Sequence, residues 1–554
     1  MTSAVELRGT GVVPGIAYAP AIWTAPRPQL PEHSPNIPEE AREAELAKFQ
    51  AAAAAVSSRL SQRASHATGV AANVLEANAS MASDKGWHKA IAKKMKTGVP
   101  AHLAVARVTD EFVVMFEKVG GLMAERTTDL KDIRDRVIAE LLGKPEPGVP
   151  TPEVPSILLA DDLAPADTAG LDPSMVIGLV TELGGPTSHT AIISRQLGIP
   201  CIVAVDNLHS LEAGEMLLVN GEAGTIQTGV DATEAEALVK ADEERREAIR
   251  TWRGPAVLAD GTPVDVLANV QDGAGAARAS ASQAQGIGLF RTELCFLSSE
   301  NEPEVKEQAR IYRDVIGAFP GKKVVVRTLD AGSDKPLKFA NFDEEENPAM
   351  GVRGIRIAAG QPSILTNQLD AIKAASDGKA TWVMAPMIAT VQEAQDFAEQ
   401  CRARGLKPGI MVEVPAVAVQ AEKFLQYVEF MSIGTNDLTQ YTMAADRMSP
   451  KLANLTNPWQ PAVLELIAMT AAAGQKTGKP VGVCGEAAAA PYLACVLVGM
   501  GVTSLSMAVA AIPAVGVQLA KVTLDQCQQA AQAALAAEDA AGAAEAARKV
   551  LVGA

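Results

Sequence analysis

Several polar and charged side chains in the second half of the chain stand at the ends of short apolar runs or in the segments that follow them. The set comprises Arg291, Arg327, Lys335, Arg353, Glu413, Asn436, Asp437, Arg447 and Cys484. Guanidinium groups bind phosphate and carboxylate groups in a bidentate manner. Glu413 and Asp437 offer the hard oxygen ligands that Mg²⁺ prefers. The residue types therefore predict a site for an anionic substrate and a magnesium ion, with pairing of both carboxylates to the arginines as the alternative.

Cys484 stands out among the six cysteines because it ends an apolar run and precedes a glycine. A thiol in cationic surroundings can have a lowered pKa and take part in proton transfer. We predict that situation for Cys484, with a role in the hydrophobic core as the alternative. Cys201 and Cys495 lie in apolar runs and are predicted core residues. No CxxC pair occurs, so neither a zinc site nor a disulfide framework is indicated, and a reducing cytoplasm is expected.

A second centre of chemistry is His189, within the segment GGPTSHTA at residues 184–191. The glycine pair lets the backbone approach a ligand closely, and three hydroxyl side chains surround the histidine. Residues 175–180 predict a buried strand and residues 191–197 a helix, which places His189 on the turn between them. The turn before a helix N-terminus suits a phosphoryl group. The alternative is a histidine buried in a core.

The elements expected to position the first set form a barrel. Eight strand-like runs are separated mostly by helical segments, which matches a (β/α)₈ TIM barrel with its active site at the carboxyl ends of the strands. The runs are 264–270, 286–290, 323–329, 381–387, 409–414, 430–433, 480–483 and 504–507. Most of the predicted site residues fall at the same end of these runs. The alanine-rich residues 525–551 predict a single terminal helix.

The first half of the chain predicts two further domains. Residues 1–29 and 146–230 carry alternating strand and helix signals and predict an α/β domain that contains His189. Residues 30–145 are helical with Gly and Pro breaks, typical of inserted helical hairpins. Residues 231–254 predict a charged linker helix before the barrel of residues 255–554.

Composition narrows the classes of function. The chain has 554 residues, 48% of them apolar, and a net charge of −16. Such an acidic protein is not expected to bind nucleic acid or anionic membranes. The first residues do not form a signal peptide, and no segment is long and apolar enough to span a bilayer.

Together, these motifs resemble enzyme I of the bacterial phosphoenolpyruvate:sugar phosphotransferase system over nearly the whole chain. The residues that carry the resemblance are 13–17 (VPGIA), 184–190 (GGPTSHT), 288–293 (GLFRTE), 326–330 (VRTLD), 347–348 (NP), 351–353 (GVR), 410–413 (IMVE), 432–441 (SIGTNDLTQY) and 482–486 (GVCGE). The last two are highly specific for barrel enzymes that use phosphoenolpyruvate. One departure is Pro186, where the family usually has arginine.

The resemblance implies a role for each predicted residue. Phosphoenolpyruvate would bind beside a Mg²⁺ ion held by Glu413 and Asp437. The implied substrate-binding residues are Arg291, Arg327, Lys335, Arg353, Asn436, Asp437 and Arg447. His189 would accept the phosphoryl group while Thr168 orients its ring, and Cys484 would protonate the enolate to give pyruvate.

The resemblance also implies partners. Phosphorylated His189 would pass its group to a histidine of the small carrier protein HPr, the first general step of sugar uptake by this system. The helical residues 30–145 would bind HPr, the α/β domain would swivel about its linkers, and the barrel would form a homodimer in the cytoplasm.

Three alternatives remain at this point. A pyruvate phosphate dikinase or phosphoenolpyruvate synthase shares the histidine and barrel modules, but would need a large ATP-binding domain before the histidine. A nitrogen-type enzyme I paralogue would carry an extra N-terminal sensory domain. A non-catalytic phosphocarrier or sensor would not need the complete set of arginine, carboxylate and cysteine residues.

Overall fold

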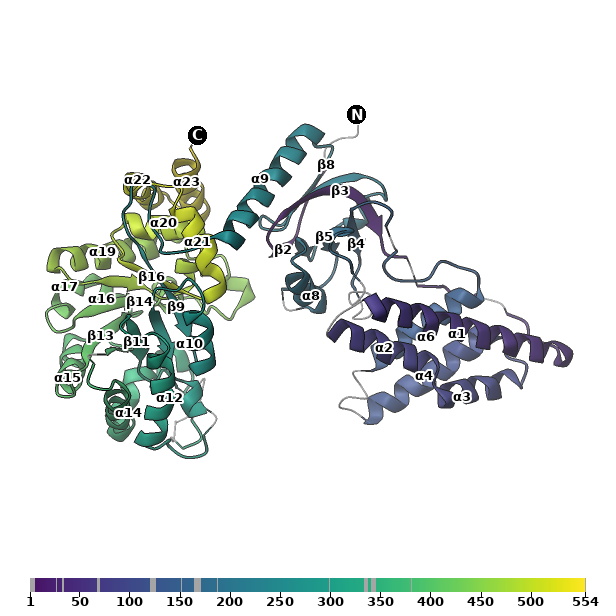
Figure 1. Ribbon diagram of the computed structural model, residues 1–554, viewed down its shortest axis with the longest axis horizontal. Coiled ribbons are helices and arrows are strands. Elements are labelled where there is room, and N and C mark those ends of the chain that lie inside the picture. The colour runs from purple at the N-terminus through teal and green to yellow at the C-terminus, as the bar shows by residue number, and fades with distance from the viewer. Residues whose placement is uncertain are drawn as a thin grey trace. The chain divides into compact units, whose positions relative to one another are not determined.

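The computed structural model describes residues 5–25, 27–31, 34–66, 70–119, 126–150, 152–163, 171–186, 188–297, 299–332, 337–339, 345–379 and 381–553. The chain forms two compact units, Met1–Arg246 and Glu247–Ala554 (Figure 1). Each unit has its own buried hydrophobic clusters. Within the described part of the chain, no helix is both long enough and apolar enough to cross a membrane.

An eight-stranded sheet organises the first unit. Its strands are β1 Glu6–Arg8, β2 Thr10–Val13, β3 Ile16–Trp23, β4 Ser156–Ala160, β5 Val176–Thr181, β6 Cys201–Val203, β7 Met216–Asn220 and β8 Thr225–Thr228. They lie in the order β1-β8-β7-β3-β4-β5-β6-β2. Strands β3 to β6 are parallel to their neighbours in this series, and the other pairs are antiparallel. Because β3 and β4 are adjacent in the sheet, the residues between them are an insertion.

The insertion is a bundle of helices with a separate core (Figure 1). Its elements are η1 Glu39–Ala41, α1 Arg42–His66, α2 Val70–Ala82, α3 Lys85–Met95, α4 Ala101–Val119 and α6 Thr127–Leu141. Asp84 begins α3 by accepting a hydrogen bond from the backbone N–H of Trp87 at 2.7 Å. The Trp87 indole donates to the Thr109 hydroxyl at 3.1 Å, which ties α3 to α4 inside this core. The bundle agrees with the helical insertion predicted from the sequence.

His189 is the first residue of helix α8, His189–Leu197, which follows β5. The Ser188 hydroxyl caps this helix by accepting a hydrogen bond from the backbone N–H of Ala191 at 3.2 Å. Gly198 ends it in a left-handed conformation with φ of 69°. The predicted helix start at residue 191, with His189 on the preceding turn, is therefore wrong by two residues. The sequence pattern was misleading because the cap is Ser188 itself, one residue before the histidine.

The remaining elements of the first unit are η2 Leu208–Ser210 and helix α9, Ala232–Thr251, which extends into the second unit. The buried Asp242 side chain of α9 accepts a hydrogen bond from the backbone N–H of Ile16 at 3.0 Å. It also pairs with Arg245 at 2.8 Å and Arg246 at 2.9 Å. The hydrogen bond to Ile16 holds this part of α9 to the first residue of β3, and the two arginines balance the charge of Asp242 within the helix.

The second unit is a closed barrel of eight parallel strands. They are β9 Asp265–Val270, β10 Ile287–Arg291, β11 Val324–Arg327, β12 Trp382–Ala385, β13 Lys407–Val412, β14 Phe430–Ile433, β15 Val481–Val483 and β16 Ser504–Met507. Each strand begins and ends within two residues of its predicted bounds. The predicted fold class, α/β with a helical insertion followed by a (β/α)₈ barrel, is confirmed.

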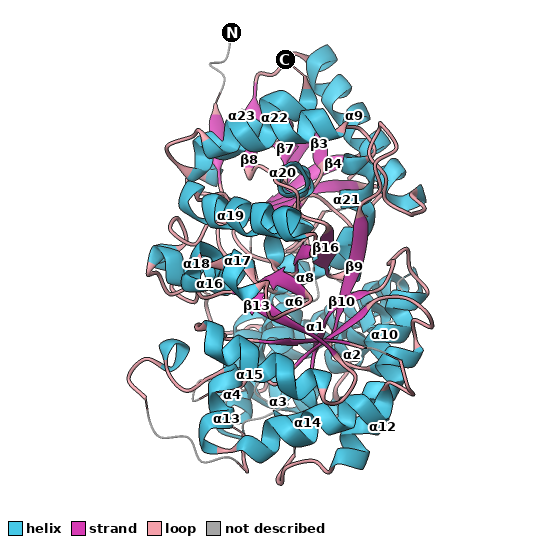
Figure 2. Ribbon diagram, turned by 90° about the vertical axis from the view of Figure 1, so that its left-hand side faces the viewer, coloured by secondary structure: helices cyan, strands magenta, loops and turns pink. Residues whose placement is uncertain are grey.

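Helices surround the barrel strands (Figure 2). They are α10 Gly273–Ser280, α11 Leu294–Leu297, α12 Val305–Gly317, α13 Ile357–Gly360, α14 Pro362–Ala375, α15 Val391–Arg402, α16 Pro415–Val419, α17 Ala421–Phe424, α18 Thr435–Met443, α19 Pro461–Thr477, α20 Pro491–Gly499 and α21 Ile512–Leu519. Short 3₁₀ turns are η3 Pro348–Met350, η4 Gly354–Arg356, η5 Pro450–Leu452, η6 Glu486–Ala489 and η7 Val509–Ala511.

The barrel interior is packed with side chains. One cluster contains Leu289, Met384, Met411 and Phe430, together with Cys484. A Cβ atom on Gly409 would lie 2.1 Å from the Phe430 ring, so a glycine is needed there to admit the aromatic side chain. These apolar side chains fill the interior of the barrel, as is usual for this fold.

The C-terminal tail differs from the prediction. It contains two helices, α22 Leu524–Leu535 and α23 Ala540–Val552, where residues 525–551 predicted one. Asp539 begins the second helix by accepting a hydrogen bond from the backbone N–H of Gly542 at 2.7 Å. The high helix propensity of the surrounding alanines hid this break, because alanine favours helix equally on both sides.

Candidate active site

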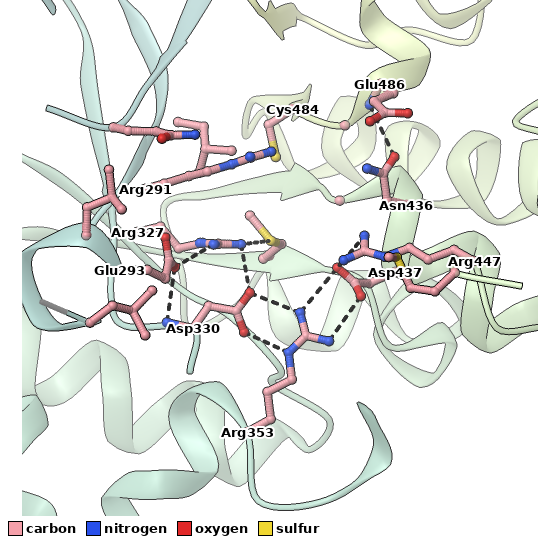
Figure 3. Close-up of a pocket in the computed structure, with 18 of the residues that line it drawn as sticks. Arg291, Glu293, Arg327, Asp330, Arg353, Asn436, Asp437, Arg447, Cys484 and Glu486 are labelled. Carbon is pink, nitrogen blue, oxygen red and sulfur yellow. Dashed lines mark hydrogen bonds and ion pairs between the residues drawn. The ribbon is translucent and has the colours of Figure 1, made fainter. Parts of the chain in front are cut away.

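A cavity of about 610 Å³ lies at the carboxyl ends of the barrel strands. The predicted residues that line it are Arg291, Arg327, Arg353, Asn436, Asp437, Arg447 and Cys484 (Figure 3). The first two are the last residues of β10 and β11, and Cys484 directly follows β15. Asn436 and Asp437 lie in the first turn of α18, after β14. The fold therefore brings together residues that are up to 193 positions apart, from 291 to 484.

Arg353 holds two carboxylates at the base of this group (Figure 3). Its Nε and Nη2 donate to the two oxygens of Asp330 at 2.9 and 3.0 Å. Its Nη1 donates to Oδ1 of Asp437 at 3.1 Å. Burial alone would lower the pKa of the guanidinium, but the bonds to the two carboxylates raise it. Arg353 thus remains charged and fixes the positions of Asp330 and Asp437.

Arg327 is paired in a similar way. Its Nη2 donates to Oε1 of Glu293 at 2.6 Å, and its Nη1 lies 3.1 Å from Oδ2 of Asp330. Burial acts to lower the pKa of Arg327, but the charges of Glu293 and Asp330 raise it. The Nε atom is buried and has no hydrogen-bond partner among the described residues. One donor of this guanidinium is therefore left for another group.

Arg291 and Arg447 have weaker ion pairing with carboxylates than Arg327 and Arg353. Arg291 has no ion-pair partner in the described part of the chain, and its side chain extends toward Cys484 (Figure 3). Arg447 lies 3.7 Å from Oδ2 of Asp437 and keeps 34% of its side chain exposed. Two guanidinium groups on one cavity with weak or no internal pairing provide positive charge for an anionic ligand.

Glu413 lies directly after β13 and is fully buried. Its Oε1 accepts a hydrogen bond from the backbone N–H of Met387 at 2.5 Å, and its Oε2 has no partner among the described residues. Burial raises the pKa of Glu413 to about 8, and the negative charges of Asp330 and Asp437 act in the same direction. A divalent cation would neutralise these charges and coordinate the unpaired oxygen, so the residues present fit a metal ion.

Asp437 is held differently from Glu413. It pairs with Arg353 and lies near Arg447, as the alternative interpretation of the sequence anticipated. Pairing with arginine and binding of a metal are compatible for a carboxylate, because each oxygen has two lone pairs.

Cys484 is 2% exposed, and its thiol donates to the backbone carbonyl of Ile433 at 3.6 Å. Burial raises the pKa of the thiol, and the opposing effects of Ser432 and Arg327 do not compensate. The predicted lowering of this pKa is therefore wrong. The prediction counted the arginines but not the loss of water around a thiolate inside the barrel. Cys484 is a protonated thiol at neutral pH, which is the state a proton donor needs.

The sequence analysis missed the carboxylates that hold the arginines. Glu293 pairs with Arg327 across two neighbouring strands, and Asp330 pairs with both Arg327 and Arg353. Both carboxylates stand within three residues of a predicted arginine, which is the only signal that the sequence contains. Their partners depend on strand pairing and on the loop that carries Arg353.

Two predicted site residues, Lys335 and Thr168, lie outside the described residues. For His189, the structure gives the place of the backbone at the start of α8.

At the same sheet edge, the side chain of His209 lies 2.8 Å from Asp161 and 3.3 Å from Glu182. Its ring stacks on Trp23 with centroids 4.6 Å apart. These contacts give His209 a structural role in the sheet.

Comparison with known sequences identifies the family. Three domain models match the chain: PEP-utilising enzyme, N-terminal (residues 8–126), mobile domain (152–224) and PEP-binding domain (245–524). The chain therefore belongs to the PEP-utilising enzymes. Together with the relatives described next, these matches confirm the resemblance predicted from the motifs.

Three relatives with curated names indicate the particular enzyme within this family. A phosphoenolpyruvate-protein phosphotransferase of Streptomyces coelicolor is 45% identical over 554 residues, covering 99% of each chain. A protein of the same name from Haloferax volcanii is 37% identical and covers 93% of this chain and 94% of its own. Another, from Staphylococcus carnosus, is 35% identical and covers 92% of each chain.

Proposed function

We propose that the protein transfers the phosphoryl group of phosphoenolpyruvate to His189 and then to a histidine of HPr, and releases pyruvate. This is the first general step of sugar uptake by the phosphotransferase system. The observation that carries the proposal is the cavity at the barrel rim, where Arg291 and Arg447 have little or no internal pairing. The full-length similarity to phosphoenolpyruvate-protein phosphotransferases supports it.

Substrate binding follows from the charges of the cavity. Arg291, Arg327 and Arg447 contact the phosphate of phosphoenolpyruvate, with Asn436 and Asp437 beside it. Arg353 supports the same pocket through Asp330 and Asp437, and Lys335 is assigned to it by family resemblance alone. Fixed cations favour the transition state of phosphoryl transfer because it spreads negative charge over the phosphoryl oxygens.

Glu413 and Asp437 are the proposed ligands of a Mg²⁺ ion. The unpaired Oε2 of Glu413 and its raised pKa both favour a cation at this place. When bound, Mg²⁺ supplies charge neutralisation and a fixed orientation for the substrate oxygens. Glu413 would then take the ionised form in which carboxylates bind metals.

The chain's own residues carry the chemical steps. Nε2 of His189 attacks phosphorus while the bond between phosphorus and the enol oxygen breaks. Thr168 is assigned to the other ring nitrogen by family resemblance alone. The thiol of Cys484 gives its proton to carbon 3 of the enolate, which becomes the methyl group of pyruvate. The resulting thiolate takes a proton from water. The raised pKa of Cys484 supports this direction of proton transfer because the thiol is protonated beforehand.

HPr is the proposed acceptor, and the helical insertion is the proposed docking domain. The α/β domain would swivel to carry phosphorylated His189 between the two partners. A homodimer formed through the barrel and a cytoplasmic location complete the proposal. Each of these five statements rests on the family resemblance.

A comparison of phosphoryl donors tests the function against the dikinase alternative. Protein incubated with Mg²⁺ and labelled phosphoenolpyruvate should become phosphorylated and should pass the label to added HPr. Protein incubated with labelled ATP should remain unlabelled. Arg291→Ala should lose labelling by phosphoenolpyruvate, whereas Arg250→Ala, which removes an exposed surface ion pair, should retain it. Labelling by ATP would overturn the proposal in favour of a dikinase.

A further inference from the structure

Asn269 in β9 is bonded to the backbone of Cys484. Its Nδ2 donates to the carbonyl oxygen of Cys484 at 3.1 Å. Its Oδ1 accepts a hydrogen bond from the hydroxyl of Ser506, in β16, at 2.6 Å. Strands β15, β16 and β9 are consecutive around the barrel, so one amide links three neighbouring strands at the level of Cys484.

The orientation of this amide is determined by its two partners. A backbone carbonyl can only accept a hydrogen bond, so Asn269 must present its NH₂ group to Cys484 and its oxygen to Ser506. Ser506 is 3% exposed and stands against Gly288 of β10. A Cβ atom on Gly288 would lie 2.4 Å from the Ser506 hydroxyl oxygen, so the glycine makes room for it.

The carbonyl that Asn269 holds belongs to the residue that carries the thiol. The chain turns immediately afterwards at Gly485, where a Cβ atom would lie 1.9 Å from the Thr435 hydroxyl oxygen. The peptide after Cys484 is therefore held at its carbonyl oxygen by Asn269 and packed closely against Thr435 at Gly485. Asn269 does not line the cavity, so its influence on a bound substrate passes through Cys484.

We infer that Asn269, oriented by Ser506, is a positioning residue that directs the Cys484 thiol at one face of the substrate enolate. This inference rests on the proposed function of Cys484. In the step concerned, the S–H bond breaks and a C–H bond forms at carbon 3, using the electron pair of the enolate double bond. The thiolate then takes a proton from water.

Stereochemistry provides the test, because a directed thiol protonates one face of the enolate and free enolpyruvate is protonated on both. The substrate is phosphoenolpyruvate with stereospecific deuterium at carbon 3, and the reaction is run in tritiated water. The configuration of the methyl group of pyruvate is then determined. Wild-type protein should give one enantiomer, and Asn269→Ala and Ser506→Ala should give a nearly racemic product.

The same variants should slow the release of pyruvate and leave the phosphorylation of the protein nearly unchanged. Release of pyruvate should slow by about 10- to 100-fold, the usual consequence of a small displacement of a reacting group. Phosphorylation of the protein in a single turnover should change by less than about 2-fold, since neither side chain lines the cavity. Ser504→Ala is the matched control, because Ser504 lies two residues earlier on β16 and is similarly buried at 5% exposure. It should retain both the rate and the single enantiomer.

A Cys484→Ala variant distinguishes the claim that Cys484 donates the proton from the claim that Asn269 positions its thiol. If this variant still yields one enantiomer, the proposed proton donor is wrong. If it yields a racemate while Asn269→Ala and Ser506→Ala retain one enantiomer, the positioning role alone is overturned. Urea midpoints of all variants, compared with wild type, identify any loss that comes from unfolding.

Discussion

At the scale of single residues, the arginines of the cavity divide into two kinds. Arg327 and Arg353 are buried and committed to carboxylates, whereas Arg291 and Arg447 are not. The first kind maintains the arrangement of Asp330 and Asp437, and the second provides charge for the ligand. Substitution of Arg327 or Arg353 is therefore expected to disturb the arrangement of the carboxylates, whereas substitution of Arg291 or Arg447 is expected to weaken ligand binding.

Arg353→Met should destabilise the barrel by about 3–5 kcal/mol, because it leaves the buried Asp330 without its bidentate partner. Urea unfolding of the barrel measures this change. Lys476→Met is the control: Lys476 and its partner Glu422 are exposed, so the loss there should stay below about 1 kcal/mol. Equal losses in both variants would contradict the importance of the Arg353 network.

The thiol of Cys484 should resist alkylation at neutral pH. Its pKa lies above the ordinary value of 9.0 because it is buried, so the reactive thiolate is scarce until the pH exceeds that value. The rate of modification by iodoacetamide, followed by mass spectrometry of the Cys484 peptide, should rise only in strongly alkaline solution. A half-maximal rate below pH 9.0 would mean that the cationic side chains outweigh burial.

At the scale of elements, the sequence predicted the barrel strands well, because buried parallel strands appear as short apolar runs between helices. The carboxyl ends of these runs also located most of the site. The carboxylate partners were not predictable, since the pairing of Glu293 with Arg327 requires two strands to be adjacent. The pKa of Cys484 was mispredicted because burial depends on the whole barrel. The break before α23 was missed because a single cap, Asp539, decides it.

Gly485→Ala should disturb the contact between the end of β15 and helix α18. Its Cβ atom would lie 1.9 Å from the Thr435 hydroxyl oxygen and 2.6 Å from the Thr435 backbone nitrogen, so backbone must move. We expect a loss of about 1–3 kcal/mol in stability together with slow pyruvate formation. Gly317→Ala in α12, where a Cβ atom meets nothing within 4 Å, should be neutral or stabilising in the same assays.

At the scale of the whole molecule, the chain consists of two units with separate cores, and the cavity belongs entirely to the second. The proposed acceptor, His189, belongs to the first. A ligand of the cavity should therefore stabilise the barrel and not the unit that contains the histidine.

Calorimetry of His189→Ala, which prevents turnover, tests this division. Phosphoenolpyruvate with Mg²⁺ at about 100 times its dissociation constant should stabilise the barrel transition by about 2.7 kcal/mol. The transition of the first unit should not move, and Arg291→Ala should abolish the shift. A shift of both transitions by the same amount would contradict independent units.

The most direct test of the central claim is the position of the phosphoryl group. After a single turnover with ³²P-labelled phosphoenolpyruvate and Mg²⁺, peptide mapping should find an acid-labile, base-stable label on the peptide that contains His189. The label should disappear in His189→Ala and persist in His209→Ala, a histidine of the same unit whose ring lies beside Asp161 and Glu182. A label that persists in His189→Ala, or that maps to another residue, would contradict the account.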